Sequence, residues 1–184
     1  MSRAFVCTAG MAVLAASALE AKVFLTQEEA LRLAFPGAAV ERRTAFLTEA
    51  QRREAQKLSG DDQLPGALVS FYVARKDGHE VGTAYFDTHV VRTMPETILV
   101  VVDPAGVLGR VEVLSFSEPE EYLPRPRWYT QFSGKSLDPE LSLKRGIRPV
   151  VGATLTARAT TAAARRVLAL HRVLHPTPAR TPTP

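Results

Sequence analysis

Apolar and polar residues in the middle of the chain follow the two-residue period of β-strands. Four runs rich in β-branched and aromatic residues carry this pattern: 67–74, 81–86, 97–102 and 107–116. Asp77-Gly78 separates the first two runs, and Asp103-Pro104-Ala105-Gly106 separates the last two, as in β-hairpins. The uninterrupted apolar run 98–102 is typical of a central strand covered on both faces. The pattern therefore predicts two antiparallel hairpins.

Helical patterns flank the predicted hairpins on both sides. Thr26 and Glu29 form the pattern of a capping box, and the short helix that they open ends at Pro36-Gly37. A second, polar helix is expected over residues 48–58, and a long amphipathic helix over residues 157–174. These elements predict an α+β fold: an antiparallel sheet of two hairpins, with N-terminal helices and a long C-terminal helix packed on it.

The two ends of the chain differ from its middle. Arg3 followed by the apolar, small-residue run 4–18 predicts that residues 1–21 are a signal peptide, with an uncleaved anchor as the alternative. The proline-rich residues 175–184 predict a disordered tail. Between these ends we expect an N-terminal helical extension over residues 22–66 and one domain over residues 67–174.

Composition excludes several kinds of function. The net charge of +4 comes from scattered basic residues, so the dense basic stripe of a nucleic-acid-binding protein is missing. The only cysteine, Cys7, lies in the predicted leader, so the exported protein would have no disulfide and no thiol chemistry. The histidines are dispersed, which argues against a metal site: His79, His89, His171 and His175. No group of nucleophile, base and orienting acid can be recognised.

The stretch Gly152-Ala153-Thr154-Leu155-Thr156 directly precedes the predicted last helix and has two interpretations. A threonine hydroxyl can simply cap the helix, which is the commoner use. Alternatively, the Gly-Ala turn lets a phosphate approach the free N–H groups and the positive end of the helix dipole. Arg158, in the first turn, opposes the dipole unless an anion is nearby. Arg165 and Arg172 follow at seven-residue intervals and indicate a solvated basic side.

These residues resemble the FMN-binding domain family. The resemblance covers residues 67–174 and rests on Gly152 to Thr156, the Asp-Pro-Ala-Gly turn and the segment Gln131-Phe132-Ser133-Gly134-Lys135. The family includes the flavin-carrying subunits of sodium-pumping NADH:quinone reductases and of Rnf-type electron-transfer complexes. It implies an FMN whose phosphate a separate flavin transferase esterifies to the threonine of Gly-Ala-Thr, here Thr154. Thr156 would then cap the helix or touch the phosphate.

Two residues depart from the family pattern. Arg148 stands where the family carries an aspartate six residues before the modified threonine, and Val151 replaces a serine or threonine. Two ways of holding FMN therefore stay open. One is the ester at Thr154, and the other is a non-covalent complex in which the guanidinium of Arg148 pairs with the phosphate. Gly152, Ala153 and Leu155 complete the expected contacts at this turn.

Other cofactor contacts are expected outside the Gly-Ala-Thr turn. Trp128 and its neighbour Tyr129 can stack on a flavin ring or fill the core, whereas Phe132 is expected in the core. Lys135 is an anion contact or a surface lysine. Residues 87–93 are expected as a loop, either solvated or folded over the cofactor with His89 or Arg92 near it.

The resemblance and the leader together imply an exported flavoprotein in the periplasm or on the outer face of the inner membrane. It would act as an electron-transfer relay rather than a stand-alone catalyst, because flavin redox chemistry belongs to the cofactor. Its partners would be a membrane redox complex, or a cytochrome or quinone, and the flavin transferase. The alternative is a flavin-free periplasmic binding or interaction module that kept the fold.

Overall fold

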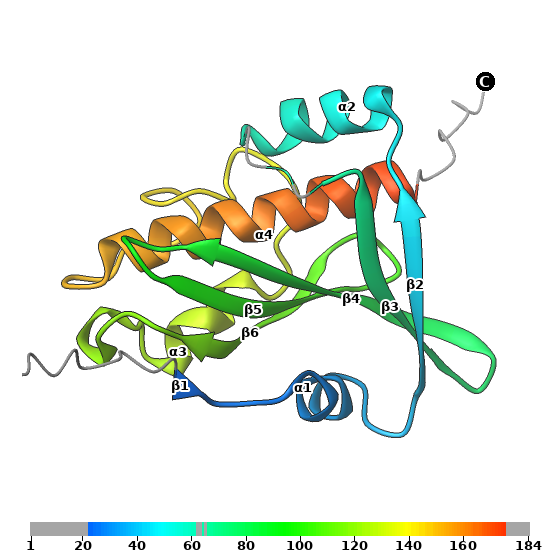
Figure 1. Cartoon of the computed structure of the whole chain (residues 1–184), viewed down its shortest axis with the longest axis horizontal. Coiled ribbons are helices and arrows are strands. Elements are labelled where there is room, and N and C mark those ends of the chain that lie inside the picture. The colour runs from blue at the N-terminus through cyan, green and yellow to red at the C-terminus, as the bar shows by residue number, and fades with distance from the viewer. Residues whose placement is uncertain (1–21, 62–63, 65, 176–184) are drawn as a thin grey trace, which may run out of the picture.

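The computed structural model describes residues 22–61, 64 and 66–175 (Figure 1). The predicted signal peptide with Cys7, and residues 176–184 of the predicted tail, lie outside the described residues. The fold is α+β, as predicted. One antiparallel sheet of six strands in the order β1-β6-β5-β4-β3-β2 is combined with helices, the longest of which is C-terminal.

The strands are β1 Lys22–Val23, β2 Ala39–Phe46, β3 Leu68–Lys76, β4 His79–Val90, β5 Pro95–Val102 and β6 Leu108–Phe116. The α-helices are α1 Gln27–Ala34, α2 Glu49–Ser59, α3 Pro126–Tyr129 and α4 Thr154–Leu174, and η1 Glu120–Tyr122 and η2 Thr130–Phe132 are 3-10 turns. Figure 1 shows α4 lying across one face of the sheet, α2 packed on the far side of α4, and α1 on the opposite face of the sheet.

The first two helices begin as the sequence predicts. The Thr26 hydroxyl accepts a hydrogen bond from the Glu29 N–H at 3.2 Å, and the Glu29 carboxylate accepts one from the Thr26 N–H at 2.8 Å. Thr48 and Gln51 form the same capping box at the start of α2. Both helices therefore satisfy their first N–H groups with their own side chains.

The sheet contains two strands that the alternating pattern did not reveal. β2 pairs with β3, and β1 pairs with β6, so residues 22–66 contribute two edge strands as well as helices. Almost every residue of β2 is exposed, so its sequence AVERRTAF has no buried face and no apolar alternation. β1 has only two residues, which is too short for any periodicity. Edge strands of this kind escape prediction because their pairing is mostly by backbone.

Strand β4 is longer than predicted. Residues 87–90, expected in a loop, continue the strand and pair with β5, with Asp87 opposite Ile98 and His89 opposite Glu96. The loop prediction was wrong because polar residues normally mark a solvated turn, whereas Asp87 and His89 are buried by ionic partners from elsewhere in the chain.

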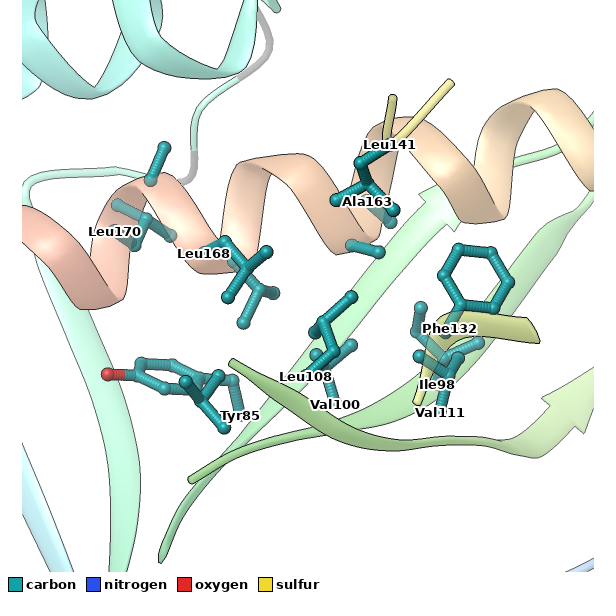
Figure 2. Packing of buried hydrophobic residues seen from close by; sticks show 14 of the residues in the cluster. Tyr85, Ile98, Val100, Leu108, Val111, Phe132, Leu141, Ala163, Leu168 and Leu170 are labelled. Carbon is teal, nitrogen blue, oxygen red and sulfur yellow. The ribbon is translucent and has the colours of Figure 1, made fainter. Parts of the chain in front are cut away.

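The central strand β5 buries both of its faces, as the run 98–102 predicts. Ile98, Val100 and Val102 belong to the core beneath α4, which Figure 2 shows together with Phe132 and side chains of the helix. Leu99 and Val101 belong to a smaller core beneath α1. The two cores fix α4 and α1 on opposite faces of the sheet, because successive side chains of a strand alternate between its faces.

Candidate functional site

The start of α4 differs from the starts of α1 and α2. The helix begins at Thr154, three residues earlier than predicted, and its N-cap residue Ala153 offers no side-chain hydrogen bond. Within the described residues, the main-chain N–H groups of Thr154 and Leu155 have no acceptor. Gly152 has a φ of +84°, and a Cβ added there would meet no atom within 4 Å. Free donors and the positive end of a helix dipole therefore face open space.

The two threonines of this turn have different environments. Thr154 is exposed, and its hydroxyl donates to the carbonyl oxygen of Val150 at 3.0 Å. Thr156 is fully buried, and its hydroxyl donates to the carbonyl oxygen of Tyr122 at 2.6 Å. Neither caps the helix, so the expectation of a threonine cap was wrong. The physical reason is the early helix start, which places Thr156 inside the first turn and directs its hydroxyl into the protein.

A cleft of about 720 Å³ opens beside Thr154. One wall is the exposed side of α4, from Thr154 to Arg165. The loop 142–149 forms a second wall, and the ends of β4 and α2 close the cleft at its inner side. The residues of α4 that line the cleft recur every three to four positions, so they lie on one face of the helix. The cleft therefore runs along the helix axis, away from Thr154.

The lining of the cleft combines apolar surface with positive charge. Its apolar part includes Leu143, Leu155, Ala159, Ala162 and Val90. Its charged part includes Arg158, one helical turn after Thr154, and Lys144. Lys144 has a φ of +67°, an unfavourable conformation for a residue with a side chain. Such a lining suits a flat, largely apolar ligand that carries an anionic group.

Arg165 holds the walls of the cleft together. Its Nη1 donates to the carbonyl oxygens of Asp138 at 2.7 Å and Leu141 at 3.1 Å, and its Nε donates to that of Ser59 at 3.0 Å. The last residue of α2 and the loop after residue 137 are thus fastened to α4. The prediction that Arg165 belongs to a solvated basic side was wrong, because main-chain carbonyl groups of two other segments surround its guanidinium.

A buried ionic cluster forms the base of the cleft. Arg166 pairs with Asp87 through two hydrogen bonds and also contacts Asp61. The His89 Nδ1 lies 2.9 Å from Asp87, and its Nε2 lies 2.9 Å from Glu96. An imidazole between two carboxylates is held as the doubly protonated cation, and these partners raise the pKa of His89 to about 9 although burial acts in the opposite direction.

The same cluster reaches the aromatic core through Glu96. This carboxylate is fully buried, and its Oε2 also accepts a hydrogen bond from Thr160 of α4 at 3.0 Å. Burial raises the pKa of the Tyr129 hydroxyl, and the charge of Glu96 adds to that effect. The cluster therefore joins β4, β5 and α4 beneath the cleft. It was not foreseen because Arg166 and Thr160, which complete it, lie more than sixty residues away in the sequence.

The remaining predicted contacts lie in a second hollow, of about 650 Å³. Trp128, Lys135 and Arg148 line it together with Arg127, and Pro149 lines both this hollow and the cleft. The structure thus gathers the predicted residues into two neighbouring groups. The other predicted residues line neither the cleft nor the second hollow: Gly152, Ala153 and Thr156.

Trp128, Tyr129 and Phe132 pack against one another. The indole N–H of Trp128 donates to the carbonyl oxygen of Arg148 at 2.7 Å, and its ring packs edge-on against Tyr129 and Phe132. Phe132 is fully buried, so its assignment to the core is confirmed. Arg92 lies over the ring of Tyr122, with 4.3 Å between its guanidinium carbon and the ring centroid, and it does not line the cleft.

Comparison with known proteins adds no relative. No family model matches this chain, and no curated protein matches it either. In the described part of the chain, no group of three or more histidine, cysteine, aspartate or glutamate side chains is placed to hold a metal ion. Among the described helices, none has the length and apolar character needed to cross a membrane.

Proposed function

We propose that this protein holds FMN in the cleft beside Thr154 and acts as an electron-transfer flavoprotein in the bacterial envelope. The observation that carries the proposal is the position of Thr154. Thr154 is exposed and lines the cleft, and it begins the only one of the three longest described helices that starts without a side-chain cap. An uncapped helix start favours a phosphate, because its N–H groups and dipole attract an anion.

The residues of the cleft fit FMN in size and chemistry. Small-molecule sites typically enclose about 300 to 1,000 Å³, and the cleft of 720 Å³ lies in this range. The phosphate would lie at Thr154, where Gly152 leaves space for it and Arg158 supplies a cation. The apolar lining at Leu155, Ala159 and Ala162 would cover a flat ring. FMN bound there would supply one- and two-electron redox chemistry, and the chain would set its exposure and potential.

Export is the second part of the proposal and rests on the sequence of residues 1–21. Such a location is consistent with a relay between membrane dehydrogenase components and cytochrome or quinone partners. Whether FMN is esterified to Thr154 by a flavin transferase or held without a covalent bond is decided by the experiment below.

The experiment compares protein produced with a flavin transferase and with free FMN. Thr154→Val removes the hydroxyl and nearly keeps the shape of the side chain. Thr44→Val is the matched control, because Thr44 is exposed on the edge strand β2, away from the cleft. Flavin absorbance is measured before and after acid precipitation of each protein.

Each result has one interpretation. Acid-stable flavin in the wild type and in Thr44→Val, but not in Thr154→Val, supports the ester. Flavin that acid releases from all three proteins supports the non-covalent complex. Absence of flavin from all three would overturn the proposal and favour the other candidate, a flavin-free envelope binding module in which the turn at Gly152 merely begins a helix.

A further inference from the structure

Positive charge is concentrated around the cleft, and in residues 125–158 it is not neutralised by ion pairs. Residues 125–158 contain seven basic and two acidic side chains, although the whole chain has a net charge of only +4. Among the described residues, no basic side chain of this segment forms an ion pair. Basic residues elsewhere in the described chain do form ion pairs, for example Arg32 with Glu28 and Arg43 with Glu41.

Five of these cations border one continuous surface. Arg127, Lys135 and Arg148 line the second hollow, Lys144 and Arg158 line the cleft, and Pro149 belongs to both. We call these five residues the basic face. The hollow depends on Gly146, because a Cβ there would lie 3.1 Å from the ammonium group of Lys135 and 2.5 Å from the carbonyl oxygen of Glu140.

We propose that the basic face docks a protein partner that presents clustered carboxylates. Like charges gathered in one place repel one another, so a partner of opposite charge gains both affinity and rate of association there. The cations line two concave hollows, into which glutamate or aspartate side chains can reach. A planar membrane surface contacts protruding side chains instead, so a lipid surface fits this arrangement less well.

The position of the basic face assigns a role to this partner. Thr154 and Arg158 line the same cleft, one helical turn apart, so a protein docked on the basic face would cover the mouth of the FMN site. If the protein holds FMN as proposed above, this partner is an electron donor or acceptor with an acidic surface. Transient redox complexes of this kind have small interfaces guided by charge.

The test measures binding of a glutamate-rich peptide to the flavin-free protein by surface plasmon resonance at several salt concentrations. In the hollow variant, Arg127, Lys135 and Arg148 are all replaced by Gln. In the control variant, Arg53, Lys57 and Arg172 are replaced by Gln. These control cations are exposed on α2 and near the end of α4, and both variants lose the same charge. Circular dichroism verifies that both variants are folded. Vesicles of phosphatidylglycerol and phosphatidylcholine are tested in parallel.

We expect the hollow variant to bind the peptide about tenfold more weakly and with a smaller salt dependence, while the control variant changes less than about twofold. Equal losses in the two variants would show attraction by net charge alone and overturn the proposal. Binding to the vesicles but not to the peptide would overturn it in favour of a lipid surface. Because no flavin is needed, the basic face can be confirmed even if the FMN proposal fails.

Discussion

Arg166 and Asp87 form a two-point ion pair beneath the cleft, with Nε 3.0 Å from Oδ2 and Nη2 2.8 Å from Oδ1. Asp87 belongs to β4 and Arg166 to α4, so the pair fastens the helix that begins at Thr154 to the centre of the sheet. The fork of a guanidinium matches a carboxylate in this geometry, whereas an ammonium group does not. The position of the inner end of the cleft therefore depends on this pair.

The first prediction concerns the stability that this pair supplies. Arg166→Ala leaves the carboxylates of Asp87 and Asp61 without this cation in a largely buried place, so we expect the free energy of unfolding to fall by about 3 to 5 kcal/mol. Arg166→Lys keeps the charge but loses the two-point geometry and should cost less. Arg172→Ala, at an exposed position of the same helix, should change stability by less than about 0.5 kcal/mol. Urea denaturation measures all three, and equal effects at 166 and 172 would refute a structural role for the pair.

The second prediction concerns the pH dependence of stability. The pKa of His89 is raised from 6.5 to about 9 in the folded protein, because its ring lies between two carboxylates. The protonated ring therefore stabilises the fold fully below pH 6.5, and this contribution is lost as the pH rises through 9. One pKa unit corresponds to about 1.4 kcal/mol, so the loss amounts to roughly 3 kcal/mol.

NMR titration of the ring of His89 tests this directly. Its signals should remain those of the protonated imidazole at pH 7.5, between the two pKa values of 6.5 and about 9. The free energy of unfolding should decline over the same interval. Signals that titrate near the ordinary histidine value would contradict the ionic cluster as described.

Much of the fold was predictable because the signals are local. A capping box needs only Thr26 and Glu29, and a hairpin turn needs only Asp77-Gly78, so a few adjacent residues decide each element. The strand residues Asp87 and His89 were misread for the opposite reason. Their burial depends on Glu96 and Arg166. The hydrophobic periodicity of one segment gives no information about which residues of another segment will pair with it.

The candidate site was predictable only in part. Thr154 could be singled out because its neighbours Gly152 and Ala153 are adjacent in the chain. The walls of the cleft could not, because they come from α2, β4 and the loop 142–149, which tertiary packing brings to α4. Trp128, Lys135 and Arg148 were expected around the same cofactor as Thr154, but in the structure they line a second hollow beside the cleft. Their sequence gives no indication of this division, because it depends on how residues 125–149 pack against α4.

The third prediction concerns Thr156, whose hydroxyl donates to the carbonyl oxygen of Tyr122 inside the protein. Thr156→Val keeps the shape of the side chain but leaves this partly buried carbonyl without its donor, which should lower the free energy of unfolding by about 1 to 3 kcal/mol. Thr156→Ser retains the hydroxyl and should lose less. Thermal denaturation of the two variants distinguishes these effects. If Val and Ser were equally tolerated, the hydrogen bond to Tyr122 would contribute nothing measurable.

The last prediction tests where the ring of FMN lies. Ala162 lines the cleft two helical turns beyond Thr154, so Ala162→Phe would fill the space that the proposed ring occupies. The Thr154 hydroxyl and the helix start are untouched, and the partly exposed position of Ala162 should let the fold survive. We therefore expect a folded protein that binds FMN at least tenfold more weakly, as measured by quenching of flavin fluorescence. Val173→Phe adds a ring near the end of the same helix, outside the cleft, and should bind FMN like the wild type. If Ala162→Phe also bound FMN normally, the flavin would not extend along α4, and the second hollow beside Trp128 would become the place to look for its ring.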